Sequence, residues 1–570
     1  MEKDLQTYQK MAREIFDSLV KAVGIHVMLL VIEKAFWKTK HMYEEASLIS
    51  FSEDGINLDR LEELEQEKAA LVAHDFVMAI IDNSWSFNRQ KDGRTVSRAA
   101  TKSGRSINLE RIATGIKALD DILQGGFPAG AAVLVVGCPG TGKTILAHQT
   151  MFYNAAPDSK VIYLTTLAEP QVKVMKFQQE FTYFDFSKVQ NSVIYHDLGS
   201  VLRKNGPGKA ISVVDELLKK HQPRLLIIDT IKTIADMIPS LTEFREFILD
   251  FSLRTATWGC TTILLGEYSE GDIEIRPESA IADGIIYLYG LEEKKKQKRF
   301  LRVLKMRGTN YAGGENFFNI TENGIEVFQR LNPVVANQQY SQFGERIATG
   351  IADLDNMTNG GLPRASTTLV SGATGTGKSI LALHFACAGV QAGEKAVYVT
   401  FEVNPRQIIS QAPGFGMDIQ RYVDSGQLYL VHVSPIELDI DEHVYRIQKT
   451  VQDTGAQRLV IDSISSFELG ISDKIKYTDH IWSLTDYFKS LGVTVLLTHE
   501  MTNSWGELSQ ITKHGVSYVA DNLIMLSYQE QGSELKSFLR VIKMRAGNHS
   551  KTQREICIDS NGLTLAKADK

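Results

Sequence analysis

Short apolar runs recur along most of the chain and alternate with longer stretches in which polar and apolar positions follow a helical period. The runs "AVLVVG", "VIYLTT", "RLLIIDT" and "TTILLGE" are rich in branched side chains and bounded by glycine or polar residues. Runs of this kind are typical of buried parallel strands, and the longer stretches are typical of helices. The pattern therefore predicts an α/β fold built on a parallel sheet.

The first hundred residues follow a different pattern. Two long segments, residues 14–45 and 58–82, are rich in helix-forming residues, and "SLISFSEDGIN" between them predicts a turn or a short hairpin. We therefore predict a separate, mainly helical module. Such a module could serve packing or dimerisation, or it could sense a signal or dock a regulatory protein, and its pattern leaves both roles open.

The rest of the chain is written twice. "ERIATGIKALDDILQGG" begins at Glu110, and "ERIATGIADLDNMTNGG" begins 235 positions later at Glu345. The same offset holds without a gap as far as "LTTLAEP" and "VTFEVNP". A repeat of this length indicates a tandem duplication of a whole domain. We predict a helical module with a basic linker (1–105), a first α/β domain (106–335) and a second (336–570).

Composition and charge narrow the classes of function. The chain has 570 residues, 43% of them hydrophobic and 23% charged, and a net charge of −6. This balance disfavours a dedicated nucleic-acid binder. The apolar run "IHVMLLVI" is too short to span a bilayer, and the four cysteines form no CxxC pair. We therefore expect a cytoplasmic protein with no membrane partner.

Each copy contains the motif GxxxxGK[ST], as "GCPGTGKT" and as "GATGTGKS". Its glycines let backbone N–H groups surround phosphate oxygens, and the following helix directs its N-terminus at the same anion. The lysine reaches the β and γ phosphates and the last hydroxyl reaches Mg²⁺. The motif predicts ATP and Mg²⁺ as cofactors, held by Gly137, Gly140, Thr141, Gly142, Lys143 and Thr144, and by Gly372, Gly375, Thr376, Gly377, Lys378 and Ser379.

Each P-loop also requires an acid on the metal side. "RLLIIDT" ends its apolar run at Asp229, and "RLVIDS" does so at Asp462. An aspartate directly after a buried strand is costly unless it serves a cation or a hydrogen-bond donor. We predict that both serve Mg²⁺; the alternative is a turn residue at the strand end.

The two P-loops, the strand ends "TFE" and "IDS" with their counterparts, and the late "KMR" of each half resemble the KaiC family of double-domain RecA-like ATPases. The resemblance runs from about Ser106 to the C-terminus and does not cover the helical module. It implies a RecA-like fold in each half, ATP bound between adjacent subunits, and a homo-oligomer in the form of a hexameric double ring. Some family members also phosphorylate themselves in the second half.

The resemblance also implies a role for the "KMR" elements. Lys305 and Arg307 in the first half, and Lys543 and Arg545 in the second, would reach the γ-phosphate held by the neighbouring subunit. A cation in that place stabilises charge on the transferred phosphoryl group. Without the resemblance, these residues would be interpreted as solvated strand ends.

The resemblance further implies a glutamate at the end of the strand beside the P-loop strand, where it orients and deprotonates the attacking group. The family has two consecutive glutamates there. The second copy has Glu402 followed by Val403, and the first has Leu167 followed by Ala168. General-base catalysis contributes about 10²- to 10⁴-fold. We therefore predict that the first domain binds ATP but hydrolyses it slowly, unless Glu169, roughly 6.5 Å further along the strand, partly substitutes.

The chemistry is accordingly predicted in the second domain. Glu402, which also lies on the metal side, would act with Lys378, and Lys543 and Arg545 would act from the neighbouring subunit. The family's phospho-acceptors align with "ITKHGVSYVADNLIML", which leaves Ser517 and Thr512 as candidate acceptors. The alternative is that these residues only pack at the subunit interface.

The chain departs from clock-type members at its end. It continues only 26 residues past Met544, which is too short for the long tail that binds the KaiA regulator. We therefore do not expect a KaiA-type partner, and the N-terminal module is a candidate for the regulatory input instead.

Three functions from different classes remain. The leading prediction is a regulatory ATPase of the KaiC type, with possible serine autophosphorylation. The second is an interaction scaffold gated by nucleotide, with little turnover. The third is a DNA-dependent ATPase of the RecA or RadA type, which the acidic net charge and the lack of a recognisable DNA-binding module disfavour.

Overall fold

The computed structural model describes residues 4–91, 110–166, 171–293, 296–330, 344–434, 440–466, 474–501, 519–531, 533–545 and 547–566. The chain forms two compact units, Met1–Val327 and Phe328–Lys570. The predicted linkers fall almost entirely outside the described residues. Among the described helices, none is both long enough and apolar enough to cross a membrane.

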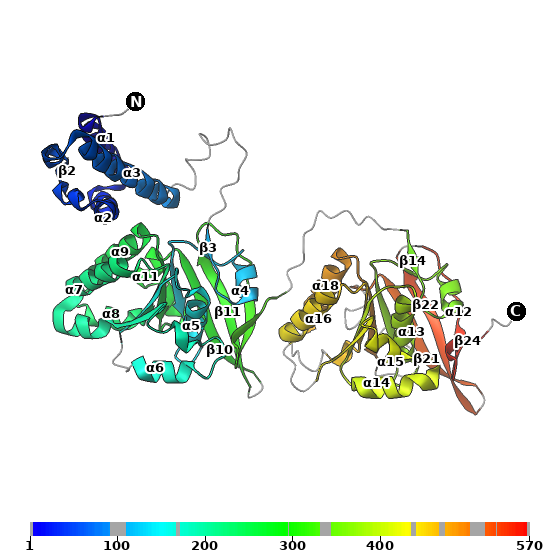
Figure 1. Ribbon diagram of the computed structural model, residues 1–570. Coiled ribbons are helices and arrows are strands. Elements are labelled where there is room, and N and C mark those ends of the chain that lie inside the picture. The colour runs from blue at the N-terminus through cyan, green and yellow to red at the C-terminus, as the bar shows by residue number, and fades with distance from the viewer. Residues whose placement is uncertain are drawn as a thin grey trace. The chain divides into compact units, whose positions relative to one another are not determined.

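The N-terminal module is helical, as predicted (Figure 1). It consists of α1 (Leu5–Val23), α2 (Ile25–Met42) and α3 (Gln66–Lys91). The segment between α2 and α3 contains the predicted short hairpin, β1 (Ser50–Ser52) paired with β2 (Gly55–Asn57). The three helices and the hairpin share one apolar core. Gly24 has a φ of 85° and allows the sharp turn from α1 to α2.

The first α/β domain is built on a nine-stranded sheet with the order β13-β12-β11-β10-β5-β9-β8-β6-β7. Strands β10, β5, β9, β8, β6 and β7 run parallel, and β11 and β12 are antiparallel neighbours at one side. The strands are β5 (Ala132–Val136), β6 (Val161–Thr165), β7 (Val193–Asp197), β8 (Leu225–Asp229), β9 (Thr261–Gly266), β10 (Gly284–Glu293), β11 (Lys296–Met306), β12 (Glu315–Thr321) and β13 (Gly324–Phe328).

Helices cover this sheet on both sides (Figure 1). Helices α7, α8 and α9 pack their apolar side chains against one face in a single buried cluster. The helices are α4 (Lys117–Ile122), α5 (Lys143–Asn154), α6 (Gln171–Gln178), α7 (Leu198–His221), α8 (Ile231–Met237), α9 (Leu241–Thr257), α10 (Glu270–Ile273) and α11 (Pro277–Ile281), and a small hairpin pairs β3 (Arg111–Ile112) with β4 (Phe127–Pro128).

The second α/β domain repeats the arrangement, with the strand order β18-β17-β19-β20-β16-β21-β22-β23-β24. The fold prediction is therefore confirmed: two tandem RecA-like domains follow a helical module. The strands are β16 (Thr367–Gly372), β17 (Ala396–Thr400), β18 (Leu428–His432), β19 (Arg458–Asp462), β20 (Thr494–Glu500), β21 (Asn522–Gln531), β22 (Glu534–Met544), β23 (Arg554–Asp559) and β24 (Gly562–Leu565), with the hairpin β14 (Arg346–Ile347) and β15 (Leu362–Pro363).

Two buried clusters hold this second sheet between its helices. Helices α16 and α18 pack on one face, and α12 to α15 pack on the other. The helices are α12 (Ala352–Met357), α13 (Lys378–Gln391), α14 (Pro405–Gln411), α15 (Ile419–Asp424), α16 (Ile440–Thr454) and α18 (Lys474–Ser490). The central strands β5 and β16, which lead into the P-loops, are buried along their whole length. The P-loops are thus anchored in the rigid centre of each domain.

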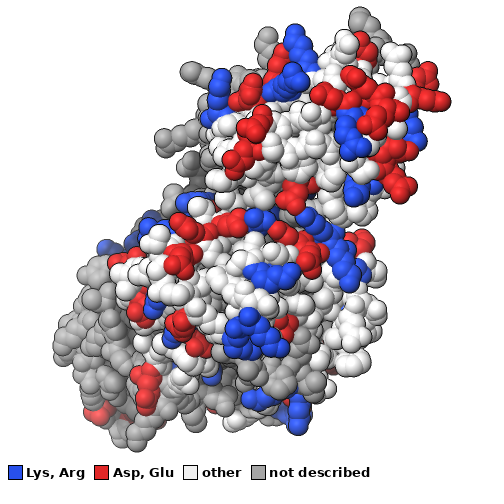
Figure 2. Space-filling model, turned by 90° about the vertical axis from the view of Figure 1, so that its left-hand side faces the viewer, with Lys and Arg blue, Asp and Glu red and all other residues white. Residues whose placement is uncertain are grey.

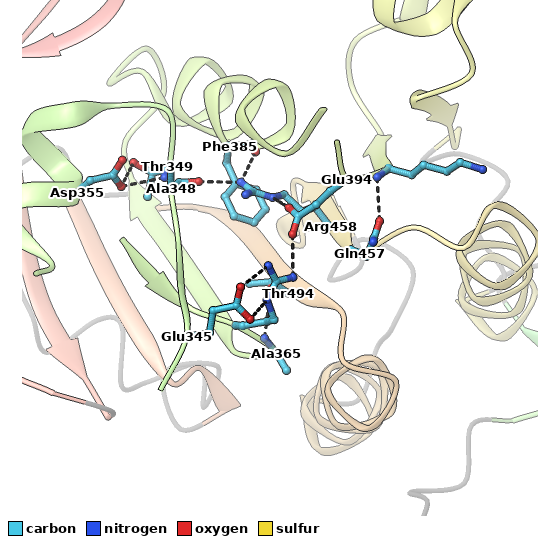
Figure 3. A network of polar contacts seen from close by, with 12 residues as sticks. Glu345, Ala348, Thr349, Asp355, Ala365, Phe385, Glu394, Gln457, Arg458 and Thr494 are labelled. Atoms are coloured by element: carbon cyan, nitrogen blue, oxygen red, sulfur yellow. Dashed lines mark hydrogen bonds and ion pairs between the residues drawn. The ribbon is translucent and has the colours of Figure 1, made fainter. Parts of the chain in front are cut away.

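A buried ion pair distinguishes the second domain's core (Figure 3). Arg458 is only 1% exposed and pairs with Glu394, its Nε lying 2.5 Å from a carboxylate oxygen. Its NH1 donates to the carbonyl oxygens of Ala348 and Phe385 at 2.7 and 2.9 Å. Glu394 is also paired with Arg364 at 2.7 Å. Because the buried charges are paired and hydrogen-bonded, this network ties the start of β19 to the segment before α12 and to helix α13.

Candidate nucleotide-binding and catalytic site

The first glycine of each P-loop occupies a position that no side chain could share. A Cβ on Gly137 would lie 2.1 Å from the carbonyl oxygen of Leu288, and one on Gly372 would lie 2.5 Å from that of Leu526. Gly142 and Gly377 immediately precede α5 and α13 with φ values of 100° and 102°. Each loop therefore turns tightly into a helix N-terminus, which is the geometry of a phosphate cradle.

The P-loop lysines begin these helices and fold back over the loops. Lys143 Nζ donates to the carbonyl oxygens of Gly137 and Cys138, each at 2.9 Å. Lys378 Nζ donates to those of Gly372 and Ala373 at 2.9 and 2.8 Å. Both ammonium groups thus lie at the mouth of their loops, where the predicted phosphates would sit.

Burial lowers the pKa of both lysines, and nearby carboxylates oppose this shift. The first carboxylate acting on Lys143 is Glu267, followed by Asp229. Lys378 is acted on by Glu500, Asp462 and Glu402. Acids therefore surround each lysine, which is suited to a site that also holds a divalent cation.

The predicted metal-side residues of the first domain lie together. Asp229 ends β8, and its carboxylate accepts hydrogen bonds from the Thr144 hydroxyl at 3.1 Å and the Tyr163 hydroxyl at 2.5 Å. Burial raises the pKa of Asp229, an effect that these hydrogen bonds oppose. A hydroxyl and a carboxylate in contact fit Mg²⁺, which retains water and phosphate oxygens as its other ligands.

The second domain holds Asp462 in a similar way at the end of β19. Its carboxylate accepts hydrogen bonds from the Tyr398 hydroxyl at 2.6 Å and from the Thr498 hydroxyl. The P-loop residue Ser379 is exposed at the start of α13. The sequence interpretation missed the tyrosines, although Tyr163 and Tyr398 stand at the repeat offset of 235 positions.

Glu402 lies two residues beyond β17, near the second P-loop. The expectation that its strand lies beside the P-loop strand is wrong, because β19 and β20 separate β17 from β16. Its pKa is raised by partial burial first, then by the carboxylates of Glu500 and Asp462, while Lys378 opposes the shift. These interactions bring Glu402 together with the predicted lysine and metal-side acid. The corresponding Leu167, with Ala168 and Glu169, lies outside the described residues.

A second acid accompanies each P-loop, and the sequence interpretation missed both. Glu500 is the last residue of β20 and lies opposite Gly372 in the sheet. The Thr374 hydroxyl of the P-loop donates a hydrogen bond to its carboxylate. Glu267 follows β9, the matching strand of the first domain. These acids were missed because they are distant in sequence from the P-loops, and only the pairing of β9 with β5 and of β20 with β16 brings them there.

The "KMR" residues lie at the opposite edge of each sheet from the P-loop of the same chain. Met306 pairs with Gly284, and Gly284 pairs with Val133 at the start of β5, whereas the P-loop follows the end of β5. Arg307 and Arg545 form ion pairs with Asp283 and Asp521 at 3.1 and 3.4 Å. These cations therefore cannot reach the phosphate site of their own domain.

The lysines of the same elements donate to backbone carbonyls. Lys305 Nζ donates to Ser279 O at 3.3 Å, and Lys543 Nζ donates to Ala520 O at 2.7 Å. Burial lowers the pKa of both lysines, with the neighbouring arginine as the next cause. Both lysines thus lie at the same end of the sheet as the arginines of their elements.

A family model described as "ATPase: KaiC" matches residues 112–332 and 347–570, which is most of the chain. The chain belongs to the KaiC ATPase family. The circadian clock protein KaiC3 of Synechocystis sp. is 28% identical over 471 residues, covering 80% of this chain and 92% of that protein. The circadian clock oscillator protein KaiC of Picosynechococcus sp. is 27% identical over 478 residues, covering 82% and 91%.

A further KaiC relative supports the same assignment. The circadian clock oscillator protein KaiC of Synechococcus elongatus is 28% identical over 468 residues, covering 80% of this chain and 88% of that protein. The helical module before residue 112 lies outside the matches to the family model. ATP binding follows from membership of this ATPase family.

The predicted phospho-acceptors and the metal-binding side chains remain to be placed. The candidate acceptors Thr512 and Ser517 lie outside the described residues. Among the described residues, no group of three or more His, Cys, Asp or Glu side chains forms a metal site of its own. All four cysteines are free thiols.

Side chains of both charge signs are mixed on the surface. On the face shown in Figure 2, Lys and Arg side chains are interspersed with Asp and Glu among the described residues.

Proposed function

We propose that this KaiC-family chain is a regulatory ATPase in which the second domain carries most of the hydrolysis and the first domain holds ATP as a scaffold. The observation that carries this proposal is the position of Glu402 beside Lys378 and Asp462, against a leucine at the matching place of the first copy. A leucine can neither accept a proton nor orient water.

In the proposed reaction, the backbone N–H groups of the second P-loop and Lys378 bind the phosphates. Ser379 and Asp462 hold Mg²⁺, which offsets the charge that develops on the β and γ phosphate oxygens. Glu402 orients the attacking water and accepts its proton. A carboxylate that is partly buried among other acids is a stronger base than an isolated one, because its pKa is raised.

We further propose that a neighbouring copy of the chain completes each site. Lys543 and Arg545 would act on ATP held by the adjacent second domain, and Lys305 and Arg307 on ATP held by the adjacent first domain. Support comes from their place at the sheet edge opposite their own P-loop. This arrangement is compatible with the proposed hexameric double ring in the cytoplasm.

The finer activities are proposals of the same kind. Ser517, with Thr512 as the second candidate, would accept a phosphoryl group in place of water. The N-terminal module would bind a regulatory protein. It contributes neither a P-loop nor a catalytic acid, so another role is open to it. The second candidate function is an interaction scaffold gated by nucleotide, with little turnover. The proposal that the first domain holds ATP without rapid hydrolysis favours it, because bound ATP stabilises the state that binds it.

Phosphate release with Mg²⁺ and ATP tests the proposal. Glu402→Gln should lower the rate about 10²-fold or more, and Lys143→Ala should leave most of it. An intact-mass time course would report a gain of about 80 Da on autophosphorylation, the mass of one phosphoryl group. Native mass with and without ATP would report ring assembly. Undiminished turnover in Glu402→Gln would contradict the division between the domains.

A further inference from the structure

The first domain lacks a glutamate at position 167 but keeps an acid on another strand next to its P-loop. Strand β9 pairs with β5 so that Gly266 lies opposite Val136, and the Gly137 N–H donates to the Gly266 carbonyl oxygen at 3.3 Å. Glu267 follows Gly266 directly. It therefore stands beside the residue at which the P-loop begins.

The equivalent acid of the second domain is engaged in the structure. The Thr374 hydroxyl donates to the Glu500 carboxylate, and the Glu500 N–H donates to the Ser465 hydroxyl at 2.8 Å. One side of the Glu500 carboxylate is thus bound to the P-loop itself. A carboxylate tethered in this way is poorly placed to follow a reacting water.

The acid of the first domain is not tethered. The P-loop residue that matches Thr374 is Pro139, which has no hydroxyl to donate. Within the described part of the chain, the Glu267 carboxylate has no hydrogen bond or ion pair, and its side chain is only partly buried. Glu267 therefore has both carboxylate oxygens available at the mouth of its P-loop.

The electrostatics place this carboxylate at the phosphate site. Glu267 is the first of the carboxylates that act on the pKa of Lys143, ahead of Asp229. It also raises the pKa of Asp229 itself. Together with the pairing of β9 and β5, these effects put the Glu267 carboxylate within electrostatic range of both the phosphate-binding lysine and the metal-side aspartate.

We propose that Glu267 is the acid that orients and deprotonates the attacking water in the first domain, which rests on the proposed ATP hydrolysis. The water oxygen bonds to the γ-phosphorus, and the bond from that phosphorus to the β–γ bridging oxygen breaks, leaving its electron pair on ADP. The water proton passes to the Glu267 carboxylate and then to solvent, so the products are ADP, inorganic phosphate and one proton.

The two domains then use different acids for one reaction. In the second domain, Glu500 is bound to Thr374, and Glu402 orients and deprotonates the water. In the first domain, Leu167 stands at the position that matches Glu402, and Glu267 orients and deprotonates the water instead. Because Glu267 approaches from β9 rather than from β6, its angle to the water differs, and its turnover is the slower of the two.

The test measures phosphate release by the full-length chain with Mg²⁺ and ATP in a Glu402→Gln background, which leaves the first domain's activity. Glu402→Gln is expected to retain a slow rate above that of Glu402→Gln/Lys143→Ala. Adding Glu267→Gln should lower this residual rate by ~10- to 100-fold without releasing bound ATP. Adding Glu274→Gln, a substitution of an exposed acid shortly after β9, should leave it unchanged.

The other outcomes separate the failure of this proposal from the failure of the proposed function. A residual rate that survives Glu267→Gln but is lost in Glu402→Gln/Glu169→Gln assigns the proton to Glu169. No residual rate above the Lys143→Ala double variant shows that Glu267 performs no base work, while the proposed function of the second domain stands. Conversely, full turnover in Glu402→Gln that is lost on adding Glu267→Gln contradicts the proposed function and leaves the role of Glu267 supported.

Discussion

The two α/β domains keep the same P-loop parts and differ in the residues that we propose to move a proton. Both have the same strand order, a P-loop lysine folded over its loop, and a tyrosine that donates to the metal-side aspartate. They differ in the residue that follows the strand after the P-loop helix, β6 or β17, because the second domain has Glu402 there and the first has Leu167. Phosphate binding rests on backbone N–H groups and one lysine, so a domain can lose its base and still hold ATP.

The cores of the two domains also differ in where they place buried polar groups. Arg458 and Glu394 form an ion pair in the second domain, and the matching positions of the first are Leu225 and Ser159. In the first domain the buried polar group is His148, whose Nδ1 lies 2.8 Å from the Thr144 carbonyl oxygen and whose pKa burial lowers to about 4. The duplicated fold thus tolerates different buried polar groups in its two copies.

The largest expected effect comes from returning the missing acid. Leu167→Glu in a Glu402→Gln background should raise phosphate release by about 10²-fold, because it restores a carboxylate where the second domain has one. Leu167→Gln is the matched control, since it is similar in size but cannot accept the proton. Equal rates for the two variants, with ATP bound in both, would mean that the leucine does not limit the first domain.

The next effect is on stability. Arg458→Leu, which copies the first domain, should lower the free energy of unfolding of the second domain by about 3–5 kcal/mol, because Glu394 loses its most buried partner. Urea unfolding measures this. The double variant Arg458→Leu/Glu394→Ser should regain much of the loss, since it removes both charges. If the single variant were as stable as the parent chain, the ion pair would be dispensable.

A smaller effect is expected at the tyrosines behind the metal-side acids. Tyr398→Phe and Tyr163→Phe each remove a hydrogen bond to a carboxylate, which is worth about 1.5–3 kcal/mol. Both variants should unfold at lower urea concentration, but only Tyr398→Phe should lower the total rate of phosphate release. An equal loss of rate from Tyr163→Phe would show that the first domain contributes as much turnover as the second.

The smallest effect is on pH dependence. Glu402 must be ionised to accept a proton, and its pKa is raised above the usual value by burial, Glu500 and Asp462. Turnover should therefore fall as the pH drops through this raised pKa. Glu500→Gln removes one like charge, so the acid limb of kcat/KM should move to lower pH. Glu530→Gln, an exposed acid of β21, should leave the limb in place. A shift toward higher pH would contradict the assignment.

The repeat made most of the fold predictable from the sequence. A constant offset through the P-loops established two equivalent domains, and each strand ending in an aspartate could be placed beside its loop. The short hairpin in the N-terminal module was predictable because "SEDG" is a turn sequence between apolar residues. The carboxylate of Glu402 was found through the resemblance of its strand end to the KaiC family.

The remaining features of the site and of the core could be found only from the order of the strands in each sheet. Glu267 and Glu500 are distant in sequence from the P-loops, and only the pairing of β9 with β5 and of β20 with β16 brings them there. Arg458 was hidden for a similar reason, because a charged residue at the start of an apolar run normally lies at the surface. Here Gly389 leaves room for it: a Cβ at that position would lie 2.4 Å from the Arg458 Cδ.

Single-turnover conversion of bound ATP compares the two pockets most directly. Lys378→Ala leaves only the first P-loop intact, and Lys143→Ala leaves only the second, so each variant can be loaded with ATP and its bound nucleotide followed over time after Mg²⁺ is added. We expect Lys143→Ala to convert its ATP to ADP about 10²-fold faster than Lys378→Ala. Faster conversion by Lys378→Ala, or failure of its first-domain pocket to retain ATP, would contradict the proposed division of labour.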